Sequence, residues 1–370
     1  MISIHDIINI KINFYIIYTV MDYNKYNNKG YTGLVNLGNT CFLNSCLQAL
    51  NHTYELDKLL DNIYLDKKNK IKIKKNVESG ILNEWNELRT IMWKNNSVIS
   101  PNKFVFNVHK IAKDKNRDIF TGWSQNDISE FLLFIIECIH ESISRPVNIR
   151  IIGNSQNEVD ELAISCYKML KDSYTKDYSE IMDLFYGILV SEITSTDGKI
   201  KYSIKPENYF ILDLPIPNSK SHITLSDCFD NFVAPEFLNG ENAWYNEKTN
   251  TKENVKKHIV FWNFPNILII TLKRFSPDGR FKRNDYIDFP LENLDLSKYI
   301  KGYNSSSYKY DLYAVCNHIG NIYMGHYTAF VKNYKNEWIH YNDQSVEIIK
   351  DLKQIITPMA YCFFYRKKNN

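Results

Sequence analysis

The sequence lacks the features of secreted, membrane-spanning and nucleic-acid-binding proteins. None of its seven cysteines lies in a CxxC pair, which argues against a disulfide framework and indicates a reducing compartment, the cytoplasm or the nucleus. No apolar stretch is long enough to span a membrane, and polar residues interrupt the Ile-rich N-terminus, where no clear signal peptide is found. The formal net charge of +3 is too small to indicate nucleic-acid binding.

The chain also lacks internal repeats and low-complexity linkers. Its 370 residues, 44% hydrophobic and 24% charged, are typical of one large packed enzyme. Residues 41 to about 140 show mainly helical patterns, with a long apolar stripe predicting a helix over 125–142. Another amphipathic segment follows at 145–180, and strand patterns dominate from Leu184 onward.

A cysteine stands at the predicted start of a helix. Apolar residues follow it at positions 43, 46, 47 and 50, the spacing of one buried helical stripe. Cys41 is therefore expected in the first turn, capped by Asn39 or Thr40, where unpaired N–H groups and the helix dipole favour an anion. We expect a thiol pKa below the ordinary value of about 8.5, hence a nucleophile if a histidine is near. Asn36 is placed to direct its amide at an oxyanion.

Taken alone, a free cysteine is more often a small buried hydrophobe. The candidate partner lies far downstream, where residues 321–331 and 338–342 are predicted to form two strands around a polar loop. If Val331 pairs with Trp338, antiparallel counting places His326 opposite residue 343.

Asn342 and Asp343 are then expected beside His326. Gly325 is expected to leave room for a substrate backbone to approach the imidazole. One hairpin would thus supply a histidine and an amide or carboxylate that fixes its tautomer, the base and orienting group of a Cys–His–Asn arrangement. The alternatives are a cross-strand packing role for His326 and a turn role for Asn342.

These residues carry a family resemblance. The segment around Cys41 and the segment 325–327 resemble the Cys box and His box of ubiquitin-specific proteases, the papain-like deubiquitinases. Further similar segments follow in the family's order between Gly30 and Arg366. These segments are 124–132, 183–187, 212–217, 268–275 and the terminal strand 361–365.

The resemblance implies an α+β papain-like cysteine protease fold with a helical thumb, a β-rich palm and β fingers. Residues 1–29 would be an N-terminal extension and 30–370 the catalytic domain. Within the extension, the Ile-rich run up to Val20 is either a short appended strand or a stretch upstream of the true start. The implied catalytic residues are the nucleophile Cys41, the general base His326, the orienting Asn342, its neighbour Asp343 and the oxyanion-hole residue Asn36.

The resemblance also implies a site for the arginine-bearing tail of ubiquitin. The implied substrate-binding residues are Gln125, Asp127, Glu130, Gly325 and Tyr327. For Asp127 the alternative is structural, because Ser124 and Asp127 have the spacing of a capping box. Glu130 lies one turn further on the same exposed side, and we assign it to substrate binding through charge-assisted hydrogen bonds.

The chain departs from the family at the fingertips. Many relatives hold a structural zinc there with two CxxC pairs, but residues 194–198 and 242–249 contain no cysteine. We therefore expect no metal and no cofactor, and we expect Cys228 to be a buried residue.

The sequence thus predicts a cysteine-dependent deubiquitinase that hydrolyses the bond after the C-terminal glycine of ubiquitin. We expect a monomer whose partners are ubiquitin or ubiquitinated proteins, with no nucleic acid and no membrane. Three alternatives stay open: a catalytically silent ubiquitin-binding module, a protease for another ubiquitin-like modifier, and a general papain-like endopeptidase. The last lacks its usual local sequence around the nucleophile.

Overall fold

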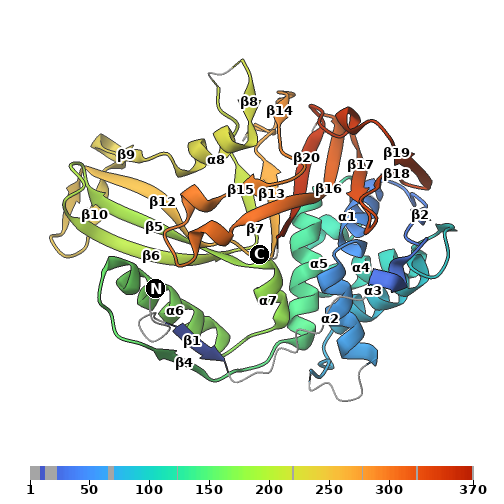
Figure 1. The fold of residues 1–370 in the computed structure, drawn as a ribbon, viewed down its shortest axis with the longest axis horizontal. Coiled ribbons are helices and arrows are strands. Elements are labelled where there is room, and N and C mark those ends of the chain that lie inside the picture. Colours follow the sequence, from blue (N-terminus) through green and yellow to red (C-terminus); the bar gives the residue numbers. More distant parts are fainter. Residues whose placement is uncertain are drawn as a thin grey trace.

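The computed structural model describes residues 9–12, 23–65, 71–122, 124–218, 221–276, 278–321 and 324–368. They form a hand-like molecule with a helical thumb, a central sheet or palm, and a second sheet that extends away as fingers (Figure 1). The predicted α+β architecture is confirmed. Within the described residues, no helix combines the length and apolar character needed to cross a bilayer.

The thumb consists of helices packed around α1 and α5, on the right of Figure 1. They are α1 (Cys41–Asn51), α2 (Tyr54–Leu65), α3 (Ser79–Met92), α4 (Asn102–Asp114) and α5 (Ile128–Ile143). Between them, β2 (Gly33–Leu34) pairs in parallel with β3 (Val98–Ile99). The predicted helix at 125–142 is confirmed but begins at Ile128, because Asp127 has extended backbone and caps it by accepting from the Ser129 amide.

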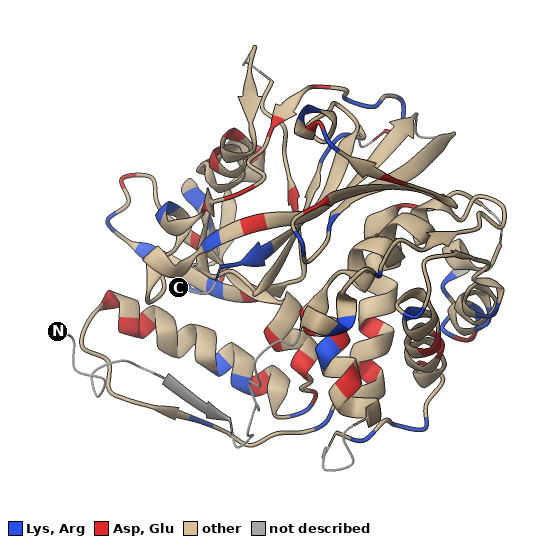
Figure 2. Ribbon diagram, turned by 45° about the vertical axis from the view of Figure 1, so that its right-hand side comes forward, with Lys and Arg blue, Asp and Glu red and all other residues tan. Residues whose placement is uncertain are grey.

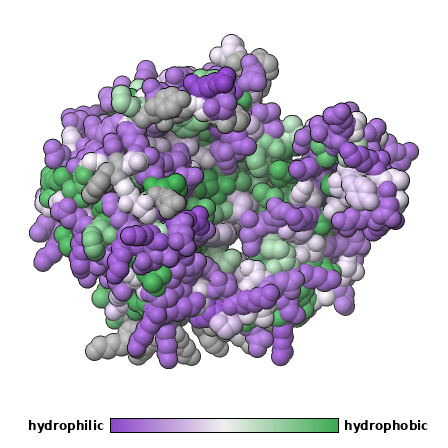
Figure 3. Space-filling model, turned by 180° about the vertical axis from the view of Figure 1, so that it is seen from behind, coloured by the Kyte–Doolittle hydropathy of each residue, from purple (hydrophilic) through white to green (hydrophobic). Residues whose placement is uncertain are grey.

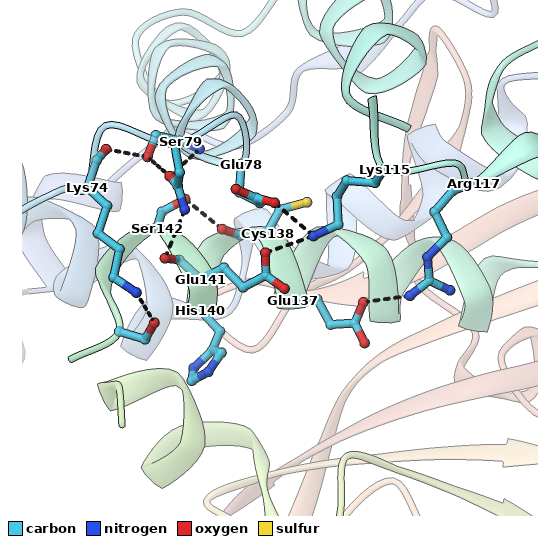
Figure 4. A network of polar contacts seen from close by, with 12 residues as sticks. Lys74, Glu78, Ser79, Lys115, Arg117, Glu137, Cys138, His140, Glu141 and Ser142 are labelled. Atoms are coloured by element: carbon cyan, nitrogen blue, oxygen red, sulfur yellow. Dashed lines mark hydrogen bonds and ion pairs between the residues drawn. The ribbon is translucent and has the colours of Figure 1, made fainter. Parts of the chain in front are cut away.

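A polar network ties α5 to the helices that precede it (Figure 4). Lys115, at the end of α4, lies 2.8 Å from Glu78 and 2.7 Å from Glu141, and Arg117 lies 3.2 Å from Glu137. Each partly exposed pair contributes about 1 kcal/mol or less. Together these ion pairs hold α5 against the other helices of the thumb. The N-terminal end of α5 therefore has a defined position beside the palm.

The palm is an eight-stranded sheet whose main order is β19-β18-β17-β16-β20-β13-β7, with β15 also paired to β16. Its strands are β7 (Ile211–Leu214), β13 (Ile267–Leu272), β15 (Leu294–Asp295), β16 (Lys309–Gly320), β17 (Gly325–Lys332), β18 (Trp338–Asn342), β19 (Ser345–Ile349) and β20 (Ala360–Lys367). Because successive side chains of a strand point to opposite faces, Ile267 and Ile269 join the thumb core while Leu268 and Ile270 join a second core.

The fingers form a sheet of order β6-β5-β12-β9 with a separate hairpin, β10–β11, at its outer end (Figure 1). Their strands are β5 (Gly187–Ser195), β6 (Lys201–Tyr209), β9 (Glu236–Leu238), β10 (Trp244–Asn246), β11 (Thr251–Glu253) and β12 (Val255–Asn263). Seen from behind, the surface is hollowed between the fingers and the rest of the molecule, and hydrophobic residues line the hollow (Figure 3).

The amphipathic segment predicted at 145–180 contains α6 (Glu158–Tyr174), whose buried residues share a core with the fingers. Beside it, β1 (Asn9–Ile12) pairs antiparallel with β4 (Ile149–Ile152). The shorter elements are α7 (Glu180–Phe185), α8 (Leu225–Val233), β8 (Ile223–Thr224) and β14 (Ile287–Asp288). Acidic and basic positions are interspersed over helices and strands alike (Figure 2).

Candidate active site

Cys41 is the first residue of α1, as predicted, and Thr40 is the N-cap residue. The Thr40 hydroxyl does not cap α1 but accepts a hydrogen bond from the Leu37 amide at 2.9 Å. Helix α1 packs against β17, and the Cys41 sulfur accepts a hydrogen bond from the backbone amide of Tyr327, the residue after His326. The fold therefore brings the Cys box and the His box together.

The expected lowering of the Cys41 pKa is wrong for this structure. Burial raises the pKa of the thiol, because only 3% of the residue is exposed and a thiolate there is poorly solvated. The Asp343 carboxylate raises it further, and the amide of Tyr327 opposes both effects. The position at the helix start does not outweigh burial, so the resting sulfur is a thiol that needs a base.

The candidate base, His326, lies on β17 directly before Tyr327, whose backbone contacts the sulfur. His326 Nε2 lies 2.7 Å from Asn342 Oδ1. Since the amide oxygen can only accept, Nε2 carries a proton, and in the neutral ring Nδ1 then keeps its lone pair. Asn342 thus holds the imidazole in the tautomer that can take a proton from a thiol.

The predicted hairpin exists, but its predicted register is wrong by one residue. Val331 pairs with Ile339, and Trp338 pairs with Lys332. The ladder ends before it reaches His326, so the contact with Asn342 is made by side chains alone. The polar loop is shorter than expected because Lys332 belongs to β17.

Asp343 forms hydrogen bonds with two asparagine side chains rather than with His326. Its carboxylate accepts from Asn36 Nδ2 at 2.9 Å and from Asn44 Nδ2 at 2.8 Å. Its φ of 51° turns the chain so that consecutive residues serve different partners. Asn36 Oδ1 accepts from the backbone amides of Gly38 and Thr40, so the side-chain Nδ2 is directed at Asp343.

Asn44 is a site residue that the sequence argument missed. It lies three residues after Cys41 in α1, and only 2% of it is exposed. The available signal was an amide side chain one turn after Cys41 on the same predicted helix.

Gln125 and Gly325 form a two-way clamp beside the histidine. Gln125 Nε2 donates to the Gly325 carbonyl at 2.8 Å, and its Oε1 accepts from the Gly325 amide at 2.7 Å. A Cβ on Gly325 would lie 2.1 Å from His318 Nε2. A side chain at position 325 would therefore clash with the His318 ring, which explains the glycine.

His318 belongs to a group of residues that the sequence argument did not find. Burial lowers its pKa to about 4, assisted by the charge of Lys282. Lys282 Nζ donates to the His318 carbonyl at 2.5 Å, tying the segment after β13 to the β16–β17 hairpin. Burial lowers the pKa of Lys282 to about 8.

The acidic residues at the start of α5 have different surroundings. Asp127 caps the helix and accepts from the hydroxyls of Tyr361 at 2.7 Å and Tyr327 at 3.5 Å. Glu130 is an exposed residue, but partial burial of its carboxyl group raises its pKa, and the charge of Asp127 adds to the rise. Asp127 is thus committed to internal contacts, whereas Glu130 keeps its carboxylate toward solvent.

At the fingertips, polar side chains occupy the position that we aligned with a zinc knuckle. Asn246 Nδ2 donates to Glu253 Oε1 at 2.6 Å, and Thr249 donates to the same oxygen at 3.0 Å. Across the described parts of the chain, no group of three or more His, Cys, Asp or Glu residues is arranged to hold a metal ion.

Comparisons with known proteins agree with this architecture. The profile of the ubiquitin carboxyl-terminal hydrolase family matches residues 32–365. Ubiquitin carboxyl-terminal hydrolase 2 of Homo sapiens is 33% identical over 348 residues, which cover 91% of this chain and 55% of that protein. The chain thus spans about half the length of its human relative. A probable ubiquitin carboxyl-terminal hydrolase of Acanthamoeba polyphaga mimivirus is 25% identical, covering 92% of this chain and 90% of that protein.

Among solved structures, the fold is similar to that of a SAGA DUB module with Ubp8 bound to ubiquitin aldehyde. The TM-score is 0.69 at 22% identity, with 95% of this chain and 72% of that chain covered. The thumb, palm and fingers described above are therefore those of a known fold, and the family match includes both the Cys41 and the His326 segments. The chain belongs to the ubiquitin carboxyl-terminal hydrolase family.

Proposed function

We propose that this chain is a cysteine deubiquitinase that hydrolyses the bond after the C-terminal glycine of ubiquitin. One observation carries the proposal: the Cys41 sulfur contacts the residue after His326, and His326 is itself held by Asn342 at 2.7 Å. The groups that we propose as nucleophile, base and orienting amide come from segments far apart in the sequence, and their contacts support the proposal. A module that only binds ubiquitin has no need of all three.

The proposed chemistry begins with a neutral thiol. His326 Nδ1 takes the proton of Cys41, and the sulfur attacks the glycine carbonyl carbon. The proton then passes to the leaving lysine amine, and a thioester remains. Water, deprotonated by the same imidazole, attacks the thioester and releases the carboxylate and the thiol. The developing oxyanion would be stabilised by the amide of Asn36, once a substrate draws it away from Asp343.

The same proposal assigns the remaining residues. Gln125 fixes Gly325 and thereby the histidine strand, and Tyr327 lies against the nucleophile. Glu130 would bind an arginine of the ubiquitin tail, and Asp127 would hold the helix that carries it. We assign residues 30–370 to the catalytic domain, acting as a monomer on ubiquitin or ubiquitinated proteins. The seven unpaired cysteines suit a reducing intracellular compartment.

The test is reaction with ubiquitin that carries an electrophile at its C-terminus, followed by mass spectrometry of the adduct. A single adduct on Cys41 is expected, and none on the Cys41→Ala variant. The variant is expected to keep its affinity for ubiquitin, measured by titration, while losing turnover of ubiquitin with a C-terminal fluorophore. Labelling of another cysteine would move the nucleophile elsewhere.

The alternatives separate in the same assays. Ubiquitin binding without turnover by the wild-type protein would favour the silent binding module. Equal or faster hydrolysis of another tail-labelled modifier would favour that modifier as the substrate. Cleavage of unrelated peptides would favour a general endopeptidase.

A further inference from the structure

The segment that precedes the Cys box lies across the boundary between thumb and palm. It begins with a 3-10 helix at Tyr23–Tyr26 and runs into β2. Although residues 1–29 were expected to be an extension, only 1% of Tyr26 is exposed. A buried aromatic residue in this position indicates that residues 23–29 also pack as part of the domain that we propose for residues 30–370.

On the thumb side, this segment is anchored by charge and by stacking. The Tyr26 hydroxyl donates to Asp57 on α2 at 2.6 Å, and Lys25 lies 2.5 Å from the same carboxylate. The Tyr26 ring lies 4.5 Å from that of Tyr54 and 4.7 Å from that of Trp93. The anchor is therefore mostly buried and resists solvent screening.

On the palm side, the segment contacts the strand that carries Asn342. The Tyr341 hydroxyl donates to the Gly30 carbonyl at 2.5 Å, and the Leu34 amide donates to the Asp343 carbonyl at 2.9 Å. Tyr341 and Asp343, the residues on either side of Asn342, are thus both hydrogen-bonded to the segment that leads into Cys41.

Gly30 makes this approach possible. Its φ is +91°, and a Cβ there would lie 2.7 Å from the Trp93 ring. Behind it, His52 is fully buried, and its Nε2 lies 3.5 Å from the Tyr341 hydroxyl. Burial lowers the pKa of His52 to about 4, so the imidazole stays neutral and adds no charge beside the Tyr341–Gly30 hydrogen bond.

We propose that residues 23–34 form a brace that positions Asn342, with Tyr26 as its anchor and the Tyr341–Gly30 hydrogen bond as its link. The inference rests on the proposed function, because Asn342 matters only if His326 is the base. Tyr341 is then a positioning residue. Its hydroxyl does not reach the reacting atoms, but it fixes the strand position from which Asn342 holds the imidazole.

The test uses Tyr341→Phe, which keeps the ring and removes the hydroxyl. We expect kcat for ubiquitin with a C-terminal fluorophore to fall about tenfold, since a buried carbonyl loses its partner and Asn342 shifts. KM is expected to stay within about twofold, because Tyr341 is only 1% exposed and is therefore out of reach of a bound substrate. In the Asn342→Ala background, the same change should alter kcat by less than about twofold, because the two residues act as one unit.

Tyr310→Phe is the matched control. Tyr310 is equally buried and donates to the Pro265 carbonyl at 2.7 Å, in the palm core away from the site. Both variants should lose similar thermal stability, but only Tyr341→Phe should lower kcat. Independent, multiplying effects of Tyr341→Phe and Asn342→Ala, or an unchanged kcat in Tyr341→Phe, would overturn the brace.

Hydrogen exchange separates this inference from the proposed function. In Tyr341→Phe, the Leu34 amide and the amides of β18 should exchange faster, and in Tyr310→Phe they should not. These exchange rates can be measured whether or not the wild-type protein hydrolyses ubiquitin. A wild-type protein without turnover would refute the function, whereas unchanged exchange in Tyr341→Phe would refute the brace.

Discussion

Replacing Gly325 with alanine is expected to disable the site through a neighbour rather than through the substrate. The added Cβ would lie 2.1 Å from His318 Nε2 and 2.9 Å from its Cε1. Ordinary contacts between such atoms are about 3.5–4.0 Å, so ring or backbone must move by on the order of 1 Å.

The ring has little freedom to move. His318 is 5% exposed and lies between Phe275 and Tyr327, whose ring centres are 5.2 and 4.8 Å away. The strain therefore falls on the backbone of Gly325 and on the adjacent His326. Overpacking of this kind costs about 1–3 kcal/mol in stability. Displacement of a reacting group by about 1 Å costs roughly 100-fold in rate.

The assay is kcat/KM for hydrolysis of ubiquitin that carries a C-terminal fluorophore. Gly325→Ala is expected to lose about 100-fold. The double variant Gly325→Ala/His318→Ala removes the ring and should recover about tenfold of that loss, since the methyl group then has room. His318→Ala alone is the control, and it should lower the melting temperature by creating a cavity more than it lowers the rate.

The recovery distinguishes two roles for the glycine. If Gly325 is small so that a substrate backbone can pass, removing the His318 ring restores nothing. A double variant no more active than Gly325→Ala would therefore refute the packing argument, as would wild-type activity of Gly325→Ala itself.

Three further predictions concern pH, binding and metal. Because burial raises the Cys41 pKa, the rate at which iodoacetamide alkylates Cys41 should keep increasing above pH 8.5. An alkylation rate that levels off by pH 7 would contradict this prediction. Asp127→Ala should cost about 1 kcal/mol in stability through the lost helix cap. Glu130→Ala should instead raise KM for ubiquitin at an unchanged melting temperature. If Asp127→Ala raised KM and Glu130→Ala lowered the melting temperature, substrate binding would belong to Asp127 and the structural role to Glu130. Elemental analysis should find no stoichiometric zinc, because Asn246 and Thr249 stand where the fingertip thiolates would lie and hydrogen-bond to Glu253 instead; one zinc per chain would show that the knuckle is misplaced.

Local patterns in the sequence were sufficient for the elements that carry the site. Cys41 begins a helix because a turn precedes it and an apolar stripe follows, and His326 lies on a strand because aromatic and β-branched residues surround it. These signals depend on neighbours within a few residues. The family resemblance joined the two segments, and with them came the α+β hand.

Tertiary structure decided how these elements meet. A shift of one residue in the β17–β18 register and the turn at Asp343 direct Asn342 to His326 and Asp343 to Asn36. Burial, which no local pattern measures, raises rather than lowers the Cys41 pKa. Sequence alone determined which side chains are available and on which elements they lie. Their partners and their protonation followed from distances between residues far apart in the chain, which only packing sets.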